Sequence, residues 1–396
     1  MRVAMFSECY EPVQNGVSTS VRELVRELRR RRHNVVVIAP HYADHLDEQP
    51  FILRVPSFQT RFNADYPLAY PWFPKLARSL DRIAPAVLHS HSPFFVGLLA
   101  ARLARRHDLP LVSTYHTLYQ HYAHYVFFLP DPAIQSLLDW WMPEYYNRCA
   151  CVIAPSRIAA DSLRGFGVRV PIEVIPTGVP IPPAAQRDES ARSAARARWG
   201  IPLDAPLLLY VGRIAQEKNL ELVLQSFACV ADGDSAVRLL IVGAGPHLDA
   251  CRTRAARLPC GERVVLAGPV PHDDLAPVYA SADVFVFGSS TETQGLVVAE
   301  ARAAGTPCVV VSEGGASETV RDGEDGLVVP AELAAFSGAI GRMLHDLPMR
   351  RAMSESCARN ARDWAPASMA QRVSGVYAHA CERHRARSHP LEPVGG

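Results

Sequence analysis

Short apolar runs of strand length alternate with longer segments of helical periodicity through the first 180 residues. The strand-like runs lie at residues 2–7, 34–39, 86–89, 111–115 and 152–154, and helices are expected at 18–31 and 95–106. Strands and helices in regular alternation build a parallel sheet with crossover helices on both faces. The pattern therefore predicts a doubly wound α/β domain over residues 1–180.

The same alternation resumes after residue 200. Strand-like runs lie at 207–211, 237–242, 264–267 and 282–287, and helices are expected at about 220–230 and 248–257. This predicts a second α/β domain over residues 201–365. Residues 181–200 belong to a proline-rich stretch without a clear period, which predicts an interdomain linker. Residues 366–396 are predicted to be a helix and tail that return toward the N-terminal domain.

Composition narrows the class of protein. The chain has 396 residues, 48% of them hydrophobic and 20% charged, which is typical of a folded protein. Its net charge of +1 gives no support for a nucleic-acid partner. Nine cysteines lack the paired spacing of zinc sites and are interpreted as reduced residues. No apolar run approaches the length of a membrane span, and Glu8 interrupts the first run, so we expect a cytoplasmic protein without a signal peptide.

Two carboxylates lie beyond the strand-like run 282–287. Glu292 belongs to the loop after the strand, and Glu300 belongs to the short helix that follows. A carboxylate can accept hydrogen bonds from two hydroxyls of a sugar or ribose. The plain alternative is that Glu292 is a solvated loop residue and Glu300 an ordinary acid of a helix surface.

The start of that short helix is a candidate anion site. The first backbone amides of a helix have no acceptor within the helix and can donate to an anion such as a diphosphate. Here these are the amides of residues 295–298, chiefly Gly295, Leu296 and Val297. A phosphate site beside two carboxylates indicates a ligand that contains both phosphate and sugar.

Other strand ends of the second domain also have ligand-compatible residues. Arg213 and Lys218 follow one strand and could neutralise a diphosphate, or could be plain surface cations. Gly243 follows the next strand, and the segment ending at Val270 follows a third and could offer backbone groups to a base.

The first domain contributes two candidates. Gly16 lies in the loop before the first helix, where a glycine permits close approach of a ligand, although a turn alone could also require it. The loop is neither a GxGxxG fingerprint nor a Walker sequence. His116 follows the strand-like run 111–115, at the sheet edge where open α/β sheets bind ligands. His121 and His124 lie nearby without an acid or cysteine at useful spacing, so no metal is expected.

An aromatic segment and a basic helix form a candidate membrane surface. The segment 115–141 contains several tyrosines, phenylalanines and tryptophans, and the helix carries six arginines between residues 22 and 32. Such surfaces bind anionic lipid. Alternatively, the aromatics belong to the core and the arginines to a solvated helix face.

Glu292 and Glu300, with seven residues between them and Ala-Gly-Thr-Pro after them, resemble the E-x7-E signature of retaining GT-B glycosyltransferases of family 4. The Gly16 loop, Tyr115-His116-Thr117, the segment 212–219 and Gly243-Ala-Gly245 follow the family's order over nearly the whole chain. Residues 114–119 and 291–295 look most like bacterial glucosyltransferases that act on diacylglycerol. Gln294 departs from the commoner family pattern, which has Phe before the glycine, and this fits that subgroup.

The resemblance implies an α/β fold of the GT-B type, with two Rossmann-like doubly wound domains facing across a cleft. It also implies roles for individual residues. Arg213 and Lys218 would hold the donor diphosphate, Glu300 the ribose diol and Glu292 the transferred sugar. His116 would lie against that sugar, and Gly16 would let the first helix approach the phosphate. No metal or other cofactor is implied, since two cations and the helix termini supply the electrostatic stabilisation.

The function expected from the resemblance is retaining transfer of glucose from UDP-glucose to a diacylglycerol-type lipid, by an enzyme peripheral to the inner membrane face. A GDP-mannose or other UDP-sugar donor, with a soluble or different lipid acceptor, is the first alternative. A non-catalytic nucleotide-sugar-binding protein is the second. The residues do not distinguish the base, sugar, acceptor or oligomeric state.

Overall fold

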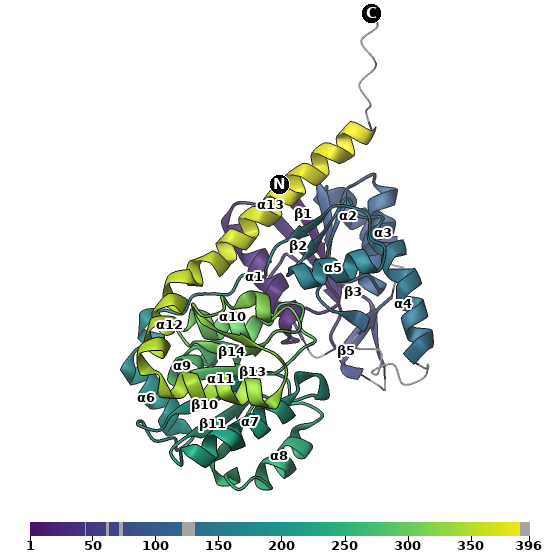
Figure 1. Ribbon diagram of the computed structural model, residues 1–396. Coiled ribbons are helices and arrows are strands. Elements are labelled where there is room, and N and C mark those ends of the chain that lie inside the picture. Colours follow the sequence, from purple (N-terminus) through teal and green to yellow (C-terminus); the bar gives the residue numbers. More distant parts are fainter. Residues whose placement is uncertain (44, 61–62, 71–73, 121–130, 389–396) are drawn as a thin grey trace, which may run out of the picture. The chain divides into compact units, whose positions relative to one another are not determined.

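The computed structural model describes the whole chain except residues 44, 61–62, 71–73, 121–130 and 389–396 (Figure 1). The chain divides into two compact units. Unit 1 comprises Met1–Gly178 and Pro366–Gly396, and unit 2 comprises Val179–Ala365. Each unit is an α/β domain around its own parallel sheet, so the predicted fold class is confirmed.

The sheet of unit 1 has the strand order β3-β2-β1-β6-β7-β8-β9, and all of its described pairings are parallel. In chain order its strands are β1 (Arg2–Phe6), β2 (Asn34–Pro40), β3 (Ile52–Val55), β6 (Val87–Ser90), β7 (Leu111–Thr114), β8 (Cys151–Ala154) and β9 (Ile172–Val174). The helices are α1 (Gly16–Arg30), α2 (Pro74–Ile83), α3 (Phe95–Arg106), α4 (Asp131–Tyr146), α5 (Arg157–Gly165) and α13 (Pro366–Ser388). An antiparallel hairpin, β4 (Ser57–Thr60) with β5 (Asn63–Ala69), was not anticipated from the sequence.

Alternate residues of β1 face the two sides of this sheet, as the pleat requires. Val3 and Met5 pack with α1 and α13, whereas Ala4 and Phe6 pack with α3, α4 and α5. Helices therefore cover both faces, which explains why β1 is apolar throughout.

The C-terminal helix α13 packs against α1 and closes one face of unit 1 (Figure 1). The hydroxyl of Tyr377 on α13 lies 2.7 Å from Nδ1 of His89 on β6, and Nε2 of His89 lies 2.8 Å from the hydroxyl of Thr114 on β7. His89 is fully buried, and burial lowers its pKa to about 3. Its burial and these two contacts identify His89 as a packing residue of the core.

The titration of His89 predicts a pH dependence of stability. The unfolded chain binds a proton at this residue below about pH 6.5, whereas the folded protein resists it until about pH 3. The free energy of unfolding is therefore highest above pH 6.5 and should fall on acidification with a slope of about 1.4 kcal/mol per pH unit from this residue. The slope, measured by urea unfolding between about pH 6.5 and 5, should flatten in His89→Asn. The exposed control His379→Asn should keep it, and an unchanged slope in both variants would contradict the prediction.

The sheet of unit 2 has the strand order β12-β11-β10-β13-β14-β15. Its strands are β10 (Leu207–Val211), β11 (Arg238–Val242), β12 (Val264–Gly268), β13 (Val284–Phe287), β14 (Cys308–Val311) and β15 (Gly326–Val329). The α-helices are α6 (Glu189–Arg198), α7 (Leu220–Gly233), α8 (Leu248–Ala256), α9 (Leu275–Ser281), α10 (Leu296–Ala303), α11 (Leu333–His345) and α12 (Leu347–Asn360).

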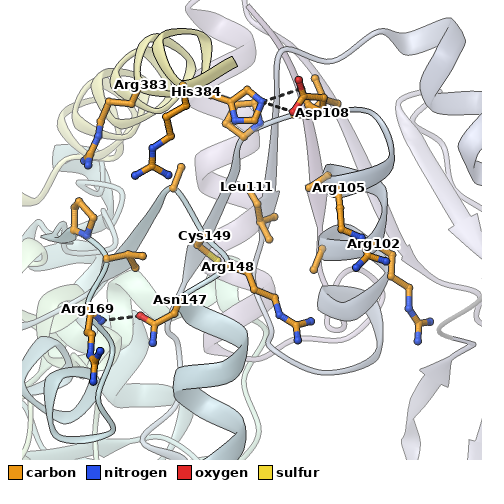
Figure 2. A pocket seen from close by; sticks show the side chains of 18 residues that line it. Arg102, Arg105, Asp108, Leu111, Asn147, Arg148, Cys149, Arg169, Arg383 and His384 are labelled. Atoms are coloured by element: carbon orange, nitrogen blue, oxygen red, sulfur yellow. Dashed lines mark hydrogen bonds and ion pairs between the residues drawn. The ribbon is translucent and has the colours of Figure 1, made fainter. Parts of the chain in front are cut away.

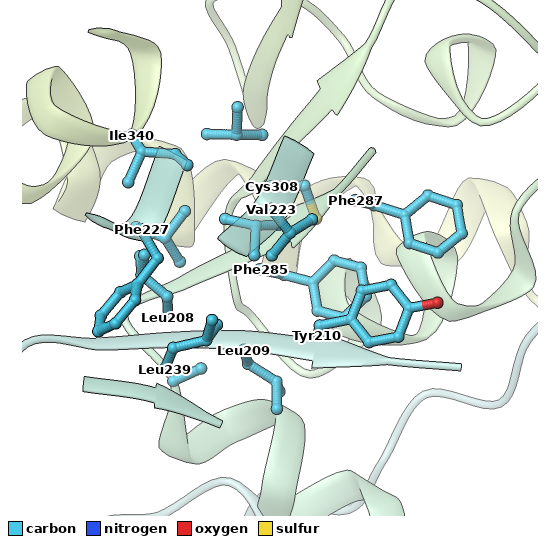
Figure 3. Packing of buried hydrophobic residues seen from close by; sticks show 14 of the residues in the cluster. Leu208, Leu209, Tyr210, Val223, Phe227, Leu239, Phe285, Phe287, Cys308 and Ile340 are labelled. Carbon is cyan, nitrogen blue, oxygen red and sulfur yellow. The ribbon is translucent and has the colours of Figure 1, made fainter. Parts of the chain in front are cut away.

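Aromatic side chains fill the centre of this second core (Figure 3). The rings of Tyr210 and Phe287 stack with centroids 5.9 Å apart, and those of Phe285 and Phe287 with centroids 6.1 Å apart. All three residues are almost completely buried. Each buried ring contributes roughly 1.5–3 kcal/mol of hydrophobic stabilisation, so β10 and β13 are fixed at the middle of the sheet. The loops that follow these two strands carry Arg213, Lys218 and Glu292.

The segment 181–200 differs from the linker predicted by its prolines. It lies within unit 2 and contains α6. Arg196 on α6 has no exposed surface, and its guanidinium binds Asp283 at 2.9 Å and the carbonyls of Pro202, Leu203 and Ala205. A fully buried and fully bonded arginine fixes a helix to its domain. The helical period was hidden because α6 is short and rich in Ala, Arg and Ser.

Candidate functional site

Unit 2 gathers its predicted residues at the carboxyl ends of adjacent parallel strands. Arg213 follows β10, Gly243 follows β11, and Val270 follows β12. The loop with Glu292 follows β13 and leads into α10. Since β10 to β13 are neighbours in the sheet, these residues share one edge, where open α/β sheets bind ligands.

Two glycines permit close backbone packing at this edge. Gly243 has a φ of 143°, and a Cβ added to it would lie 1.9 Å from the carbonyl oxygen of Gly212. Gly295 has a φ of 77° as the N-cap of α10, and an added Cβ would lie 2.9 Å from that of Ala316. Any larger residue at Gly243 would displace the loop that contains Gly212 and Arg213.

The amino end of α10 offers an anion fewer backbone amides than the sequence predicts. The amide of Val298 already donates to the carbonyl of Gly295 at 3.0 Å, so Val298 is removed from the predicted set. The amides of Leu296 and Val297 occupy the first turn, which has no acceptor within the helix. These two amides can therefore donate to an anion at the start of α10.

Lys218 and Glu292 form an ion pair. Nζ of Lys218 lies 2.5 Å from Oε1 of Glu292, and the two side chains are only 12% and 19% exposed. The backbone of Glu292 is also held, because its carbonyl accepts from the amide of Gly315 at 2.7 Å. The structure thus brings together two residues that lie 74 positions apart in the sequence and were predicted for different parts of the donor. Arg213 is exposed at the same edge, and its carbonyl accepts from the hydroxyl of Tyr210 at 3.0 Å.

Glu300 is oriented by two residues that the sequence-based prediction does not include. Oε2 of Glu300 accepts from the hydroxyl of Tyr279 at 2.7 Å, and Oε1 lies 3.1 Å from Nε2 of His272. Burial, followed by the charge of Glu300, raises the pKa of Tyr279 well above its usual value. The phenol therefore stays protonated and donates to the carboxylate. His272 follows β12, a position that could have identified it, whereas Tyr279 lies in an apolar helix without any such signal.

In unit 1, His116 belongs to a histidine pair at the carboxyl ends of β6 and β7. Its Nε2 lies 2.9 Å from Nδ1 of His91. Burial lowers the pKa of His116 to about 4 and that of His91 well below its usual value. Both imidazoles are therefore neutral near pH 7, so His116 is suited to hydrogen bonding with a sugar rather than to supplying charge. The sequence-based prediction does not include His91.

Gly16 is exposed at the first position of α1. The cap of this helix is Asn15, whose side chain accepts from the amide of Ser18 at 2.9 Å. At the end of β1, Glu8 accepts from the amide of Val96 at 3.0 Å. Burial raises the pKa of Glu8, and this hydrogen bond opposes the rise. Glu8 thus occupies the amino end of α3, while the first turn of α1 keeps the amides of Gly16 and Val17.

The membrane surface expected from the sequence is only partly described. Residues 121–130, which include His121 and His124, lie outside the described residues. Trp140 and Leu137 on α4 are 60% and 51% exposed, whereas Tyr115, Tyr145 and Tyr146 belong to the core. On α1, Arg26 and Arg30 pair with Glu23 and Glu27. Arg31, the C-cap of α1, donates to the carbonyl of Ala367.

The described residues contain neither a membrane-spanning helix nor a cluster of metal ligands. No helix among them is both long and apolar enough to cross a bilayer. No three of their histidine, cysteine, aspartate or glutamate side chains are grouped as metal ligands. Metal independence stays a prediction.

Two parallel α/β domains, one with an E-x7-E pair beside a cation, define the class of this protein as a glycosyltransferase of the GT-B fold. Residues 14–181 match the family model "Glycosyltransferase Family 4", and residues 191–363 match "Glycosyl transferases group 1". The chain belongs to glycosyltransferase family 4 and is a hexosyltransferase.

Relatives within the family differ in their substrates. An alpha-monoglucosyldiacylglycerol synthase from Streptococcus pneumoniae is 32% identical over 78% of this chain and 70% of its own length. A GDP-mannose-dependent alpha-mannosyltransferase from Mycobacterium tuberculosis is also 32% identical, over 88% of this chain and 86% of its own. Among solved structures, sucrose-phosphate synthase from Thermosynechococcus elongatus has a TM-score of 0.77 at 23% identity, covering 95% and 98% of the two chains. Anabaena HepE with UDP-glucose has a TM-score of 0.74 at 17% identity, covering 95% and 99%.

Proposed function

We propose that this enzyme transfers glucose from UDP-glucose to a diacylglycerol-type lipid, with retention of the anomeric configuration, at the inner face of the membrane. The ion pair between Lys218 and Glu292, beside the amino end of α10, is the observation that carries the proposal. It places a cation for a diphosphate next to a carboxylate for sugar hydroxyls. The name of the Streptococcus pneumoniae relative, a glucosyldiacylglycerol synthase, supports the sugar and the acceptor.

In the proposed mechanism, the diphosphate binds the amides of Leu296 and Val297 and exchanges part of the Lys218–Glu292 pairing for a contact of its own with Lys218. Arg213 adds a second cation. Tyr279 and His272 orient Glu300, and each uses one acceptor site of its carboxylate. The remaining lone pairs of the two carboxylate oxygens accept hydrogen bonds from the two ribose hydroxyls. Fixed positive groups at the diphosphate stabilise the charge that develops as the glycosidic bond breaks, without reorganising in the reaction.

Glu292 and His116 have roles at the transferred sugar. Glu292 accepts hydrogen bonds from its hydroxyls, and neutral His116 contacts it from unit 1. The acceptor hydroxyl attacks the face that the diphosphate leaves, and a diphosphate oxygen takes its proton. This front-face course retains configuration without a protein nucleophile. Two exposed apolar residues of α4, Trp140 and Leu137, support a lipid surface in unit 1.

A specific observation favours a second candidate, a GDP-mannose donor. The mannosyltransferase relative from Mycobacterium tuberculosis matches this chain at the same identity as the glucosyltransferase and over a larger share. Base contacts made mainly by backbone near Val270 would not distinguish the two donors by residue type.

Nucleotide release from a panel of UDP- and GDP-sugars tests the proposal, without added metal and with or without diacylglycerol in vesicles. We expect release from UDP-glucose to rise with diacylglycerol and an alkali-labile glycolipid to accumulate, because the lipid hydroxyl is the acceptor. The matched variant Trp140→Ala/Leu137→Ala should lose the lipid-dependent increase and keep the basal release. Release from GDP-mannose alone would show that the donor is GDP-mannose and not UDP-glucose. Release from UDP-glucose that does not depend on the lipid would contradict the proposed lipid acceptor.

A further inference from the structure

A pocket of about 960 Å³ lies at the amino-terminal edge of the unit 1 sheet (Figure 2). Leu111, the first residue of β7, lines it together with Ala150 before β8 and Pro171 before β9. His116 lies beyond the opposite end of β7. Four strand residues at about 3.3 Å each separate the two edges by roughly 10 Å or more, so the pocket is distinct from the candidate sugar site.

Positively charged side chains line much of the pocket. Its six arginines come from α3, the segment after α4, the segment before β9, and α13, and they are Arg102, Arg105, Arg148, Arg169, Arg383 and Arg387. Among the described lining residues, Asp108 is the only acid. Nε2 of His384 lies 2.9 Å from the carbonyl oxygen and 3.1 Å from Oδ1 of Asp108, so this acid is already engaged (Figure 2).

Few of these arginines are neutralised within the protein. Arg148 pairs with Glu144 on the exposed surface of α4. Arg105, Arg169, Arg383 and Arg387 form no ion pair with any described residue, although all four are exposed. Like charges gathered around one hollow repel one another and destabilise the fold. The chain as a whole has 41 basic and 40 acidic residues, so this local excess is not a consequence of overall composition.

Helix ends explain only part of the excess. The helices α3, α4, α5 and α13 all end on this side of unit 1, and cations near a helix C-terminus complement its dipole. Each helix end is equivalent to about half a negative charge. Glu144, Asp108 and the four helix ends together offset about four of the six arginine charges. The remaining excess of about two positive charges favours an external anion.

We propose that this pocket binds an anion with two or more phosphate groups. Guanidinium groups bind phosphate through paired N–H donors, and arginines on several sides of a hollow contact several phosphates at once. A soluble polyphosphate and the headgroups of anionic lipids share this chemistry. The ligand would bind unit 1 without occupying the edge that carries His116, so the site can act as a regulatory or anchoring site whatever sugar is transferred.

The test compares two double variants with the same change of charge. Arg169→Gln/Arg383→Gln removes two exposed arginines from different segments of the pocket. Arg78→Gln/Arg351→Gln removes two exposed arginines that do not line it. Binding of inorganic tripolyphosphate is measured by calorimetry with saturating UDP present, so that a donor site that binds the diphosphate is filled. We expect the pocket variant to bind about tenfold to a hundredfold more weakly and the control to bind like the unchanged protein.

Vesicle sedimentation distinguishes the two sources of phosphate. Vesicles of phosphatidylglycerol with phosphatidylcholine are compared with vesicles of phosphatidylcholine alone. Loss of binding to the anionic vesicles in the pocket variant alone would identify lipid headgroups as the ligand. Loss of tripolyphosphate binding alone would identify a soluble polyphosphate. Equal effects of the two double variants on both probes would overturn the proposal, and unchanged circular dichroism spectra would show that both variants are folded.

Discussion

Replacement of Lys218 by Gln is expected to lower turnover about a hundredfold to a thousandfold, the usual cost of removing one group that stabilises developing charge. Lys218 is one of only two lysines in the chain and is only 12% exposed in its pair with Glu292. Its ammonium is the proposed cation for the donor diphosphate. The measurement is steady-state nucleotide release with the donor that the panel identifies, with kcat and KM determined separately.

The pair with Glu292 adds a second expectation to this prediction. In Lys218→Gln, Glu292 loses its counter-ion at 2.5 Å and should bind sugar hydroxyls less precisely. The effects of Lys218→Gln and Glu292→Gln should therefore not add in the double variant. Additive effects would indicate that the two residues act on the donor independently.

The control is Lys75→Gln, a change of the only other lysine, which is exposed near the start of α2. It makes the same change of charge and should leave turnover unchanged. Lys218→Arg should retain part of the activity, because the charge remains while the compact ammonium is replaced by a larger planar group. Full activity of Lys218→Gln would show that Lys218 is a structural partner of Glu292 and does not act on the donor.

Replacement of Arg302 by Met is expected to destabilise unit 2 by about 3–5 kcal/mol, because it leaves a buried carboxylate without its counter-ion. Arg302 on α10 is 2% exposed and pairs with Asp325, which has no exposed surface. Arg302 also donates to the carbonyl of Thr319, whose hydroxyl donates to the carbonyl of Gln294 at 2.7 Å. Gln294 immediately precedes the N-cap Gly295, so this network fixes the start of α10. The measurement is the urea midpoint of unit 2, followed by fluorescence.

The double variant Arg302→Met/Asp325→Asn should recover part of the loss, since it removes the unpaired charge. The exposed control Arg342→Met should change stability by less than about 0.5 kcal/mol. If Arg302→Met unfolds at the same urea concentration as the unchanged protein, the ion pair does not stabilise unit 2.

The sequence by itself determined the fold class and the family. Continuous apolar runs such as Val284–Phe287 identified buried parallel strands, because strands covered on both faces have no polar alternation. Local chemistry predicted Glu292, Glu300 and the N-cap glycine of α10 as site residues, since all three lie within one strand–loop–helix unit. The sequence-based prediction of a linker was wrong for residues 181–200, because α6 follows the prolines there and buried Arg196 fixes it to unit 2.

Only the tertiary structure decided which distant residues meet. Lys218 reaches Glu292 because β10 and β13 are neighbours although three helices and two strands separate them in the chain. The same strand order gives Glu300 its partners Tyr279 and His272, and the return of α13 to unit 1 brings Tyr377 to His89. The arginine pocket likewise requires four separate segments to end at one edge. Hydrophobic periodicity records which face of each element is buried, but the order of strands and the direction of each crossover determine which polar side chains share an edge.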